Sequence, residues 1–87
     1  MPQFVGPSGV IQAISFDGTY ESAIPVLLWI NRNVPPLAYW IPKPQSIRIP
    51  NFDGDMTAAA GDWIVQDANG QFRPVAPAVF EALYEPV

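Results

Sequence analysis

The pattern of hydrophobic and polar positions predicts a strand near the start of the 87-residue chain. Residues 10–16 (VIQAISF) are rich in β-branched and aromatic side chains and alternate roughly in polarity, which is typical of a strand. One predicted face carries Val10, Gln12, Ile14 and Phe16, and the other carries Ile11, Ala13 and Ser15. Because both faces are largely apolar, we expect this strand to lie in the middle of a sheet.

A run of eight residues without a polar side chain, 23–30, predicts the principal helix. Thr19 and Ser22 are alternative N-caps, because either hydroxyl can accept a hydrogen bond from a free N–H of the first turn. If Ser22 is the cap, Pro25 falls in the first turn, where its missing N–H costs little, and the helix spans 23–32. A helix that is apolar nearly all round is either enclosed or presents one face to a partner. Its apolar positions are a stripe of Ile24, Leu27 and Leu28, extended around the helix by Val26, Trp29 and Ile30.

Proline and glycine mark two further segments. Residues 1–9 hold two of each and are expected to form an extended arm over the surface, outside any strand ladder or helix. Residues 34–44 are rich in proline, which fixes φ and disfavours a helical residue before it, so that a stiff, extended connector is predicted. The apolar residues of this connector either staple it over the core or, with Trp29, form a rigid aromatic ridge that anchors a partner. The ridge consists of Leu37, Tyr39, Trp40 and Ile41.

From Ser46 onward the chain is predicted to form a β-meander. Asp53-Gly54 and Asn69-Gly70 are typical of two-residue type I′ hairpin turns, and Gly61-Asp62 marks a corner. The predicted strands are 47–49, 56–58, 63–65 and 71–73, followed by an edge strand at 84–87. Between them, Pro77 opens a short helix at 78–83 with Val79, Phe80 and Leu83 inward. The fold class is therefore α+β, with a twisted, mostly antiparallel sheet of five to six strands and one principal helix in a single domain, 1–87.

The composition excludes disorder and several kinds of chemistry. Apolar residues make up 49% of the chain and charged residues 14%, whereas a disordered chain combines low hydrophobicity with high net charge. The chain has no cysteine and no histidine, so it lacks disulfides, the commonest general base and the commonest metal ligand. We therefore expect a protein without catalytic activity, cofactor or metal.

The charge balance bears on possible partners. Eight acids outnumber four bases, for a net charge of −4, and a protein that binds the nucleic-acid backbone needs clustered cations. The run of eight residues is too short for a membrane-spanning helix, which needs about 20. We expect no secretory leader and a soluble protein of a reducing interior, such as a host cytoplasm. Arg32, Arg48 and Arg73 would contact an anionic ligand only if the fold brought them together.

One acidic segment and one further aspartate are candidates for a site. The residues Asn51 and Asp53-Gly54-Asp55 resemble the start of a calcium-binding loop. Such a loop, however, needs about six oxygen ligands and a bidentate Glu at its twelfth position. A hairpin turn explains the same residues better. Asp62 follows a corner glycine, where an aspartate commonly accepts hydrogen bonds from neighbouring backbone amides, so a structural role is favoured over acid–base chemistry.

The C-terminal third carries a series of spaced motifs. They are Gly54-Asp55-Met56, Gly61-Asp62-Trp63-Ile64, Gly70-Gln71-Phe72, Pro74, Pro77, Phe80 and Tyr84-Glu85-Pro86-Val87. This segment resembles the ending shared by many small proteins encoded by tailed phages and prophages, and residues 12–30 are similar to the opening strand and helix of that family. Val75 and Ala78 stand where those relatives carry a cysteine and an acid. The resemblance implies a phage origin and a shared fold, and it transfers no catalytic residue.

Three functions are consistent with these observations. The first is a phage-encoded interaction protein that binds a host protein, for example of a defence system, through the aromatic and proline-rich surface. The second is a virion component, such as a capsid-decorating or connector protein. The third is an oligomeric protein that sequesters a nucleotide immune signal. The small number of arginines argues against the third function, which alone requires a nucleotide ligand. The expected partner is another protein or a second copy of the chain, and neither nucleic acid nor membrane is expected.

Overall fold

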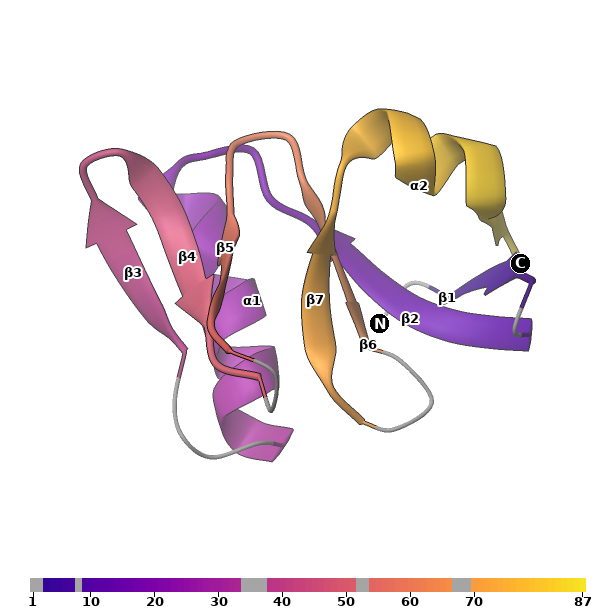
Figure 1. The fold of residues 1–87 in the computed structure, drawn as a ribbon, viewed down its shortest axis with the longest axis horizontal. Helices are drawn as coiled ribbons and strands as arrows, with labels where there is room; N and C mark the ends of the chain where they lie inside the picture. The colour runs from indigo at the N-terminus through magenta and orange to yellow at the C-terminus, as the bar shows by residue number, and fades with distance from the viewer. Residues whose placement is uncertain (1–2, 8, 34–37, 52–53, 67–69) are drawn as a thin grey trace.

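Two antiparallel sheets and two helices make up the part of the chain that the computed structural model describes, residues 3–7, 9–33, 38–51, 54–66 and 70–87 (Figure 1). The five-stranded sheet has the order β7-β6-β2-β1-β8 and the three-stranded sheet the order β3-β4-β5. The α+β class is as expected, but the strands divide between two sheets. The strands are β1 (Gln3–Gly6), β2 (Gly9–Ser15), β3 (Tyr39–Pro42), β4 (Gln45–Ile49), β5 (Met56–Ala58), β6 (Trp63–Gln66), β7 (Phe72–Val75) and β8 (Glu85–Pro86), and the helices are α1 (Tyr20–Asn33) and α2 (Pro77–Leu83).

Strand β2 lies at the centre of the five-stranded sheet, as its two apolar faces predict, between β1 and β6. The expectation of an N-terminal arm outside the ladder is wrong for residues 3–6, which form β1 and pair with β2 and β8. The pair Gly6–Gly9 closes the β1–β2 hairpin, so Pro7 lies in the turn, where its missing N–H removes no ladder hydrogen bond. The short β8 at the sheet edge agrees with the predicted final edge strand.

The three-stranded sheet corrects the interpretation of residues 34–44 as a connector. Residues 39–42 form β3, which pairs with β4 from Tyr39–Arg48 to Pro42–Gln45. Pro42 ends the strand and Pro44 lies in the turn, so the prolines border the strand and do not interrupt it. Asn31 joins the end of α1 to this sheet, because its Oδ1 accepts a hydrogen bond of 2.8 Å from the Ala38 N–H. Residues 34–37, including Leu37, lie outside the described residues.

The two predicted hairpin turns lie partly outside the described residues. The last described ladder pairs are Ile49–Met56 and Gln66–Phe72, so six residues of sequence separate the first pair and five the second. Burial of alternate residues fixes the register of each paired strand. Asp53 and Asn69 themselves lie outside the described residues.

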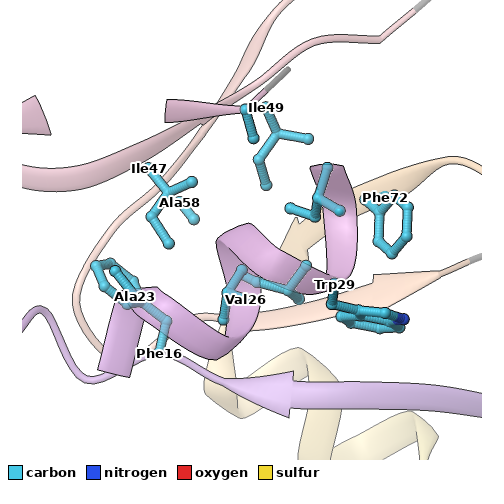
Figure 2. Packing of buried hydrophobic residues seen from close by; sticks show 11 residues of the cluster. Phe16, Ala23, Val26, Trp29, Ile47, Ile49, Ala58 and Phe72 are labelled. Atoms are coloured by element: carbon cyan, nitrogen blue, oxygen red, sulfur yellow. The ribbon is translucent and has the colours of Figure 1, made fainter. Parts of the chain in front are cut away.

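Hydrophobic side chains form two clusters on opposite faces of the five-stranded sheet. The first cluster fills the space between α1, the three-stranded sheet and the five-stranded sheet. Figure 2 shows Ile47 of β4 pointing toward the helix and Phe72 of β7 beside Trp29. The second cluster lies under α2 and includes Ala13, Val65 and Phe80. Neighbouring residues of a strand reach different clusters: Ile64 joins the first, and Trp63 and Val65 join the second, as the alternation of side chains in a strand requires.

Helix α2 begins with Pro77 at its first turn, as predicted, but only one of its three expected inward residues is buried. Phe80 is buried, whereas Val79 and Leu83 are exposed. Val79 and Leu83 are four residues apart and share a helix face that points away from the sheet. Phe80 instead stacks on Tyr84, one turn further along, with ring centroids 5.0 Å apart.

Candidate functional site

The start of α1 is fixed by a small network of polar groups. The Thr19 hydroxyl accepts a hydrogen bond of 3.1 Å from the Ser22 N–H and donates one of 2.6 Å to Asp17 Oδ1. The Thr19 N–H donates to the same oxygen at 2.9 Å. Of the two candidate N-caps, Thr19 is therefore the one that caps the helix, and α1 begins at Tyr20. Pro25 then lies in the second turn and not in the first.

This network changes the acidity of Asp17. The hydroxyl of Ser22, and then the hydroxyl and N–H of Thr19, lower the pKa of the Asp17 carboxyl from its ordinary value of 3.8 to about 2. Hydrogen bonds to the ionised form favour that form, so Asp17 carries its charge at the N-terminus of α1, where the helix dipole also favours an anion.

With this start, α1 turns Ala23, Val26, Trp29 and Ile30 toward the core. Its opposite face leaves three large apolar side chains in solvent: Tyr20 is 53% exposed, Ile24 40% and Leu28 59%. They follow one another at intervals of four residues and form a continuous stripe along the helix. The exposed Glu21 and Arg32 flank the stripe in the first and last turns. We call Tyr20, Glu21, Ile24, Leu28 and Arg32 the α1 outer face.

The aromatic ring of Tyr20 connects this face to the core. It meets the ring of Trp40 edge to face, with centroids 5.5 Å apart, and Trp40 in turn meets the ring of Phe16 at 6.2 Å. One edge of the Tyr20 ring is therefore held in place, while the rest of the side chain remains in solvent. The stripe is preorganised at this end.

The structure distributes the predicted aromatic ridge differently from the expectation. Trp29 is 7% exposed and packs edge to face against Phe72 with ring centroids 4.7 Å apart. It is a core residue, and its assignment as a contact residue is corrected. The reason is its place on α1, where it lies on the same side as Val26 and Ile30.

In β3 the ridge residues point to both sides of the strand. Trp40 packs against the first cluster, whereas Tyr39 is 53% exposed and Ile41 is partly buried on the opposite face. Consecutive residues of a strand alternate between faces, so Tyr39, Trp40 and Ile41 cannot form one contact surface. Leu37 lies outside the described residues.

The three arginines do not form one cluster. Arg32 lies in the last turn of α1, and Arg48 of β4 pairs with Asp55 at 4.0 Å. Arg73 lines a hollow of about 350 Å³ with Asn51, Gly54, Asp55, Met56 and Gln71. Asp55 thus pairs with Arg48 and lines the same hollow as Arg73. Helix α1 contributes no residue to this hollow, so Arg32 lies apart from it.

The candidate acids have structural roles in the described residues. Asp62 Oδ2 accepts a hydrogen bond of 2.9 Å from the Ala59 N–H, and the Asp62 N–H donates to the Ala59 oxygen at 3.0 Å, which is the corner role that the sequence favours. The Asn51 side chain donates to the Phe72 carbonyl oxygen at 3.0 Å. Within the described ranges, no three acidic side chains lie together in a way that would hold a metal ion.

Several motif residues of the C-terminal third build the second cluster. The rings of Trp63 and Phe80 stack with centroids 4.2 Å apart and nearly parallel planes. Tyr84 covers Gly6, where a side chain would collide with its ring. Gly61, at the corner, has a φ of +93°, which favours glycine. These positions are accounted for by folding.

The sequence analysis did not name Tyr20, Glu21, Ile24 or Leu28 as contact residues, and it left Tyr20 and Glu21 outside the helix because it placed the start at residue 23. The signal that identifies the apolar stripe is the spacing of four residues from Tyr20 through Ile24 to Leu28, which becomes visible once Thr19 is taken as the cap.

Comparisons with protein families, with curated proteins and with solved structures found no match to this chain. Over the residues that the structure describes, neither helix has the length and apolar character needed to cross a bilayer.

Proposed function

We propose that the chain is a small, non-enzymatic binding protein that acts by protein–protein contact through the α1 outer face. The observation that carries this proposal is the exposure of Tyr20, Ile24 and Leu28, at 53, 40 and 59%. All three lie on one stripe of a helix whose other side is already buried. Contiguous exposed apolar side chains rimmed by charged ones are typical of interaction sites.

The construction of the helix favours such a role. Thr19 caps α1, and Tyr20 is held by the ring of Trp40. The start of the helix and the Tyr20 ring are therefore held by contacts within the chain, and preorganised groups lose less entropy on binding. A stripe of apolar side chains at intervals of four residues suits a partner that offers a groove or a second helix.

The proposal extends to a phage-encoded protein whose partner is a host protein, for example a component of a defence system. Support for the phage origin comes from the spaced motifs between Gly54 and Val87. Support for a non-enzymatic role comes from the sequence, which has neither histidine nor cysteine, and from the structural bonds of Asp62. A virion component would use the same face, and its partner would then be another protein of the particle.

Site-specific photo-crosslinking tests the proposal. In one protein a photoreactive amino acid replaces Glu21, which flanks the stripe, so the apolar residues of the stripe are unchanged. In the control protein it replaces Glu81, an exposed glutamate on α2. We expect protein adducts from position 21 and none from position 81, in infected-cell lysate and in purified particles. Mass spectrometry then separates a host protein, a virion protein and a second copy of the chain. Equal labelling from both positions, or no adduct from position 21, would reject the α1 outer face as the site.

A further inference from the structure

The two ends of the α1 outer face carry opposite charges. Glu21 lies in the first turn of the helix and Arg32 in the last, and both are exposed. Among the described residues, neither side chain has an ion-pair partner. Between them lies the apolar stripe, so the face is acidic at one end, apolar in the middle and basic at the other end.

These two charges lie on the same side of the helix. They are eleven residues apart, and at 3.6 residues per turn this separation is within about 20° of a whole number of turns. Leu28 lies between them along the helix and within about 40° of their line, and Ile24 lies about 60–80° to one side of it, toward Tyr20. From residue 21 to residue 32 the face presents an acid, two apolar side chains and a base. Read in the opposite direction it presents a base, two apolar side chains and an acid, so each end is complementary to the other.

We propose that the α1 outer face binds a second copy of this chain, with the two helices antiparallel about a two-fold axis that crosses the outer face at the level of residue 26 along the helix. This inference rests on the proposed function and names its partner. Ile24 then packs against Leu28 of the partner subunit, and Glu21 lies beside Arg32 of the partner subunit. The two-fold axis repeats each contact.

Charge complementarity favours a second copy in this orientation. A parallel pair would place Glu21 beside Glu21 and Arg32 beside Arg32, which repel each other. The antiparallel pair turns both repulsions into attractions and also opposes the two helix dipoles, whose unlike ends attract. A two-fold pair is the commonest symmetric assembly.

The expected affinity is modest. Fourteen residues of helix are about 21 Å long. One face of such a helix buries less area than the roughly 800 Å² per partner of a standard interface. We therefore expect a reversible dimer with a dissociation constant on the order of 10–100 μM. Such a dimer is measured by sedimentation equilibrium over a range of protein concentrations.

Charge reversal provides the test. Glu21→Arg and Arg32→Glu each place like charges across the interface, and we expect each variant to weaken the dimer by about fivefold or more. The double variant restores both attractions and should return to within about twofold of the parent. An equimolar mixture of the two single variants should form a heterodimer, because each pair of facing charges between the two chains then joins a base to an acid.

For Glu21→Arg, the local ion pair and the net charge of the chain predict opposite changes in dimer affinity. Replacing an acid by a base raises the net charge of −4 by two, so Glu21→Arg reduces overall repulsion between copies and yet should weaken the dimer. Glu81→Arg, the same change on α2, is the matched control and should leave the dimer intact or strengthen it. Circular dichroism confirms that each variant is folded, and Leu28→Asp provides a second disruption that does not depend on ion pairs.

The outcomes separate this inference from the proposed function. Dimers that lose affinity with Leu28→Asp but ignore both charge reversals would overturn the antiparallel arrangement. A parent protein that stays monomeric at millimolar concentration would overturn self-association altogether. The proposed function would survive that result if position 21 still crosslinked to a different protein, and it would fail if position 21 gave no adduct at all.

Discussion

Gly18 is the residue at which the chain turns from β2 toward α1, and two features require a glycine there. Its φ is +95°, which a side chain disfavours. A Cβ atom at this position would also lie 2.7 Å from Ala60 Cβ, so that the loop before the Gly61 corner would have to move. The cap of α1 begins at the next residue, and the position of the helix therefore depends on this close approach.

We expect Gly18→Ala to lower the free energy of unfolding by about 2–4 kcal/mol, from backbone strain and overpacking together. Gly9→Ala is the matched control, because Gly9 has a similar φ of +105° but open space around it. It should cost about 1 kcal/mol, from strain alone. Urea denaturation measures both values. Equal losses in the two variants would mean that the contact with Ala60 has no energetic role.

Asp17 makes the stability of the fold depend on pH. Its folded-state pKa of about 2 lies below the ordinary value of 3.8, so its stabilising effect is present above about pH 4 and is lost as the pH falls through about 2. Asp17→Asn should therefore unfold at a lower temperature than the parent at pH 7, and the difference should shrink between pH 4 and pH 2. An NMR titration of the carboxyl group with a midpoint near 3.8 would contradict this account.

At the level of single residues, the sequence predicted the local roles well. The Gly61-Asp62 pair alone predicts a corner whose aspartate accepts a hydrogen bond from a neighbouring backbone amide, as Asp62 does from the Ala59 N–H. The choice between Thr19 and Ser22 as the cap did not follow, because both hydroxyls satisfy the local requirement. The structure distinguishes them, because the Thr19 hydroxyl accepts a hydrogen bond from the Ser22 N–H, whereas the Ser22 hydroxyl donates to the Thr19 carbonyl oxygen.

Among the elements, β3 shows most clearly where local reasoning stops. Its proline neighbours predict an extended chain, which is correct, but pairing with β4 depends on a partner strand and not on the segment itself. The pairing decides which side chains are buried: Trp40 faces the first cluster and Tyr39 faces solvent. The predicted ridge is therefore a strand whose consecutive side chains point to opposite faces.

The aromatic residues of α1 and β3 should respond differently to truncation. Trp29→Ala removes a buried indole that packs on Phe72 and should cost about 3–5 kcal/mol, enough to unfold much of a domain of this size. Trp40→Ala, which loses contacts to Phe16 and Tyr20, should also destabilise the fold. Tyr39→Ala should change stability by less than about 0.5 kcal/mol. Thermal unfolding followed by circular dichroism ranks the three, and a stable Trp29→Ala protein would contradict the assignment of Trp29 to the core.

For the molecule as a whole, the division into two sheets explains why α1 keeps an apolar face in solvent. The five-stranded sheet is covered on both faces, by the first cluster and by α2 with the second cluster. Helix α1, which lies behind the three-stranded sheet in Figure 1, has sheets on only one of its sides. Among the described residues of the 87-residue chain, no further element covers the other side.

The sequence predicted the class of the fold and the order of most elements, because periodicity and turn residues report on local structure. It did not predict that β3, β4 and β5 separate from the other strands, since that depends on contacts between distant segments. A helix apolar nearly all round left an enclosed helix and an open face as alternatives, and the predicted contact residues did not include Ile24 and Leu28, which the structure leaves exposed. Tyr20 required the correct helix start.

Hydroxyl-radical footprinting of the unmodified protein tests the central claim, that the α1 outer face is the surface that meets a protein partner. Tyr20 on this face and Tyr39 on β3 are both 53% exposed in the isolated chain, so they form a matched pair of the same residue type. We predict that oxidation of Tyr20 falls as protein concentration rises or when the partner is added, while oxidation of Tyr39 stays constant. Equal oxidation of the two tyrosines under every condition, or protection of Tyr39 alone, would contradict the claim.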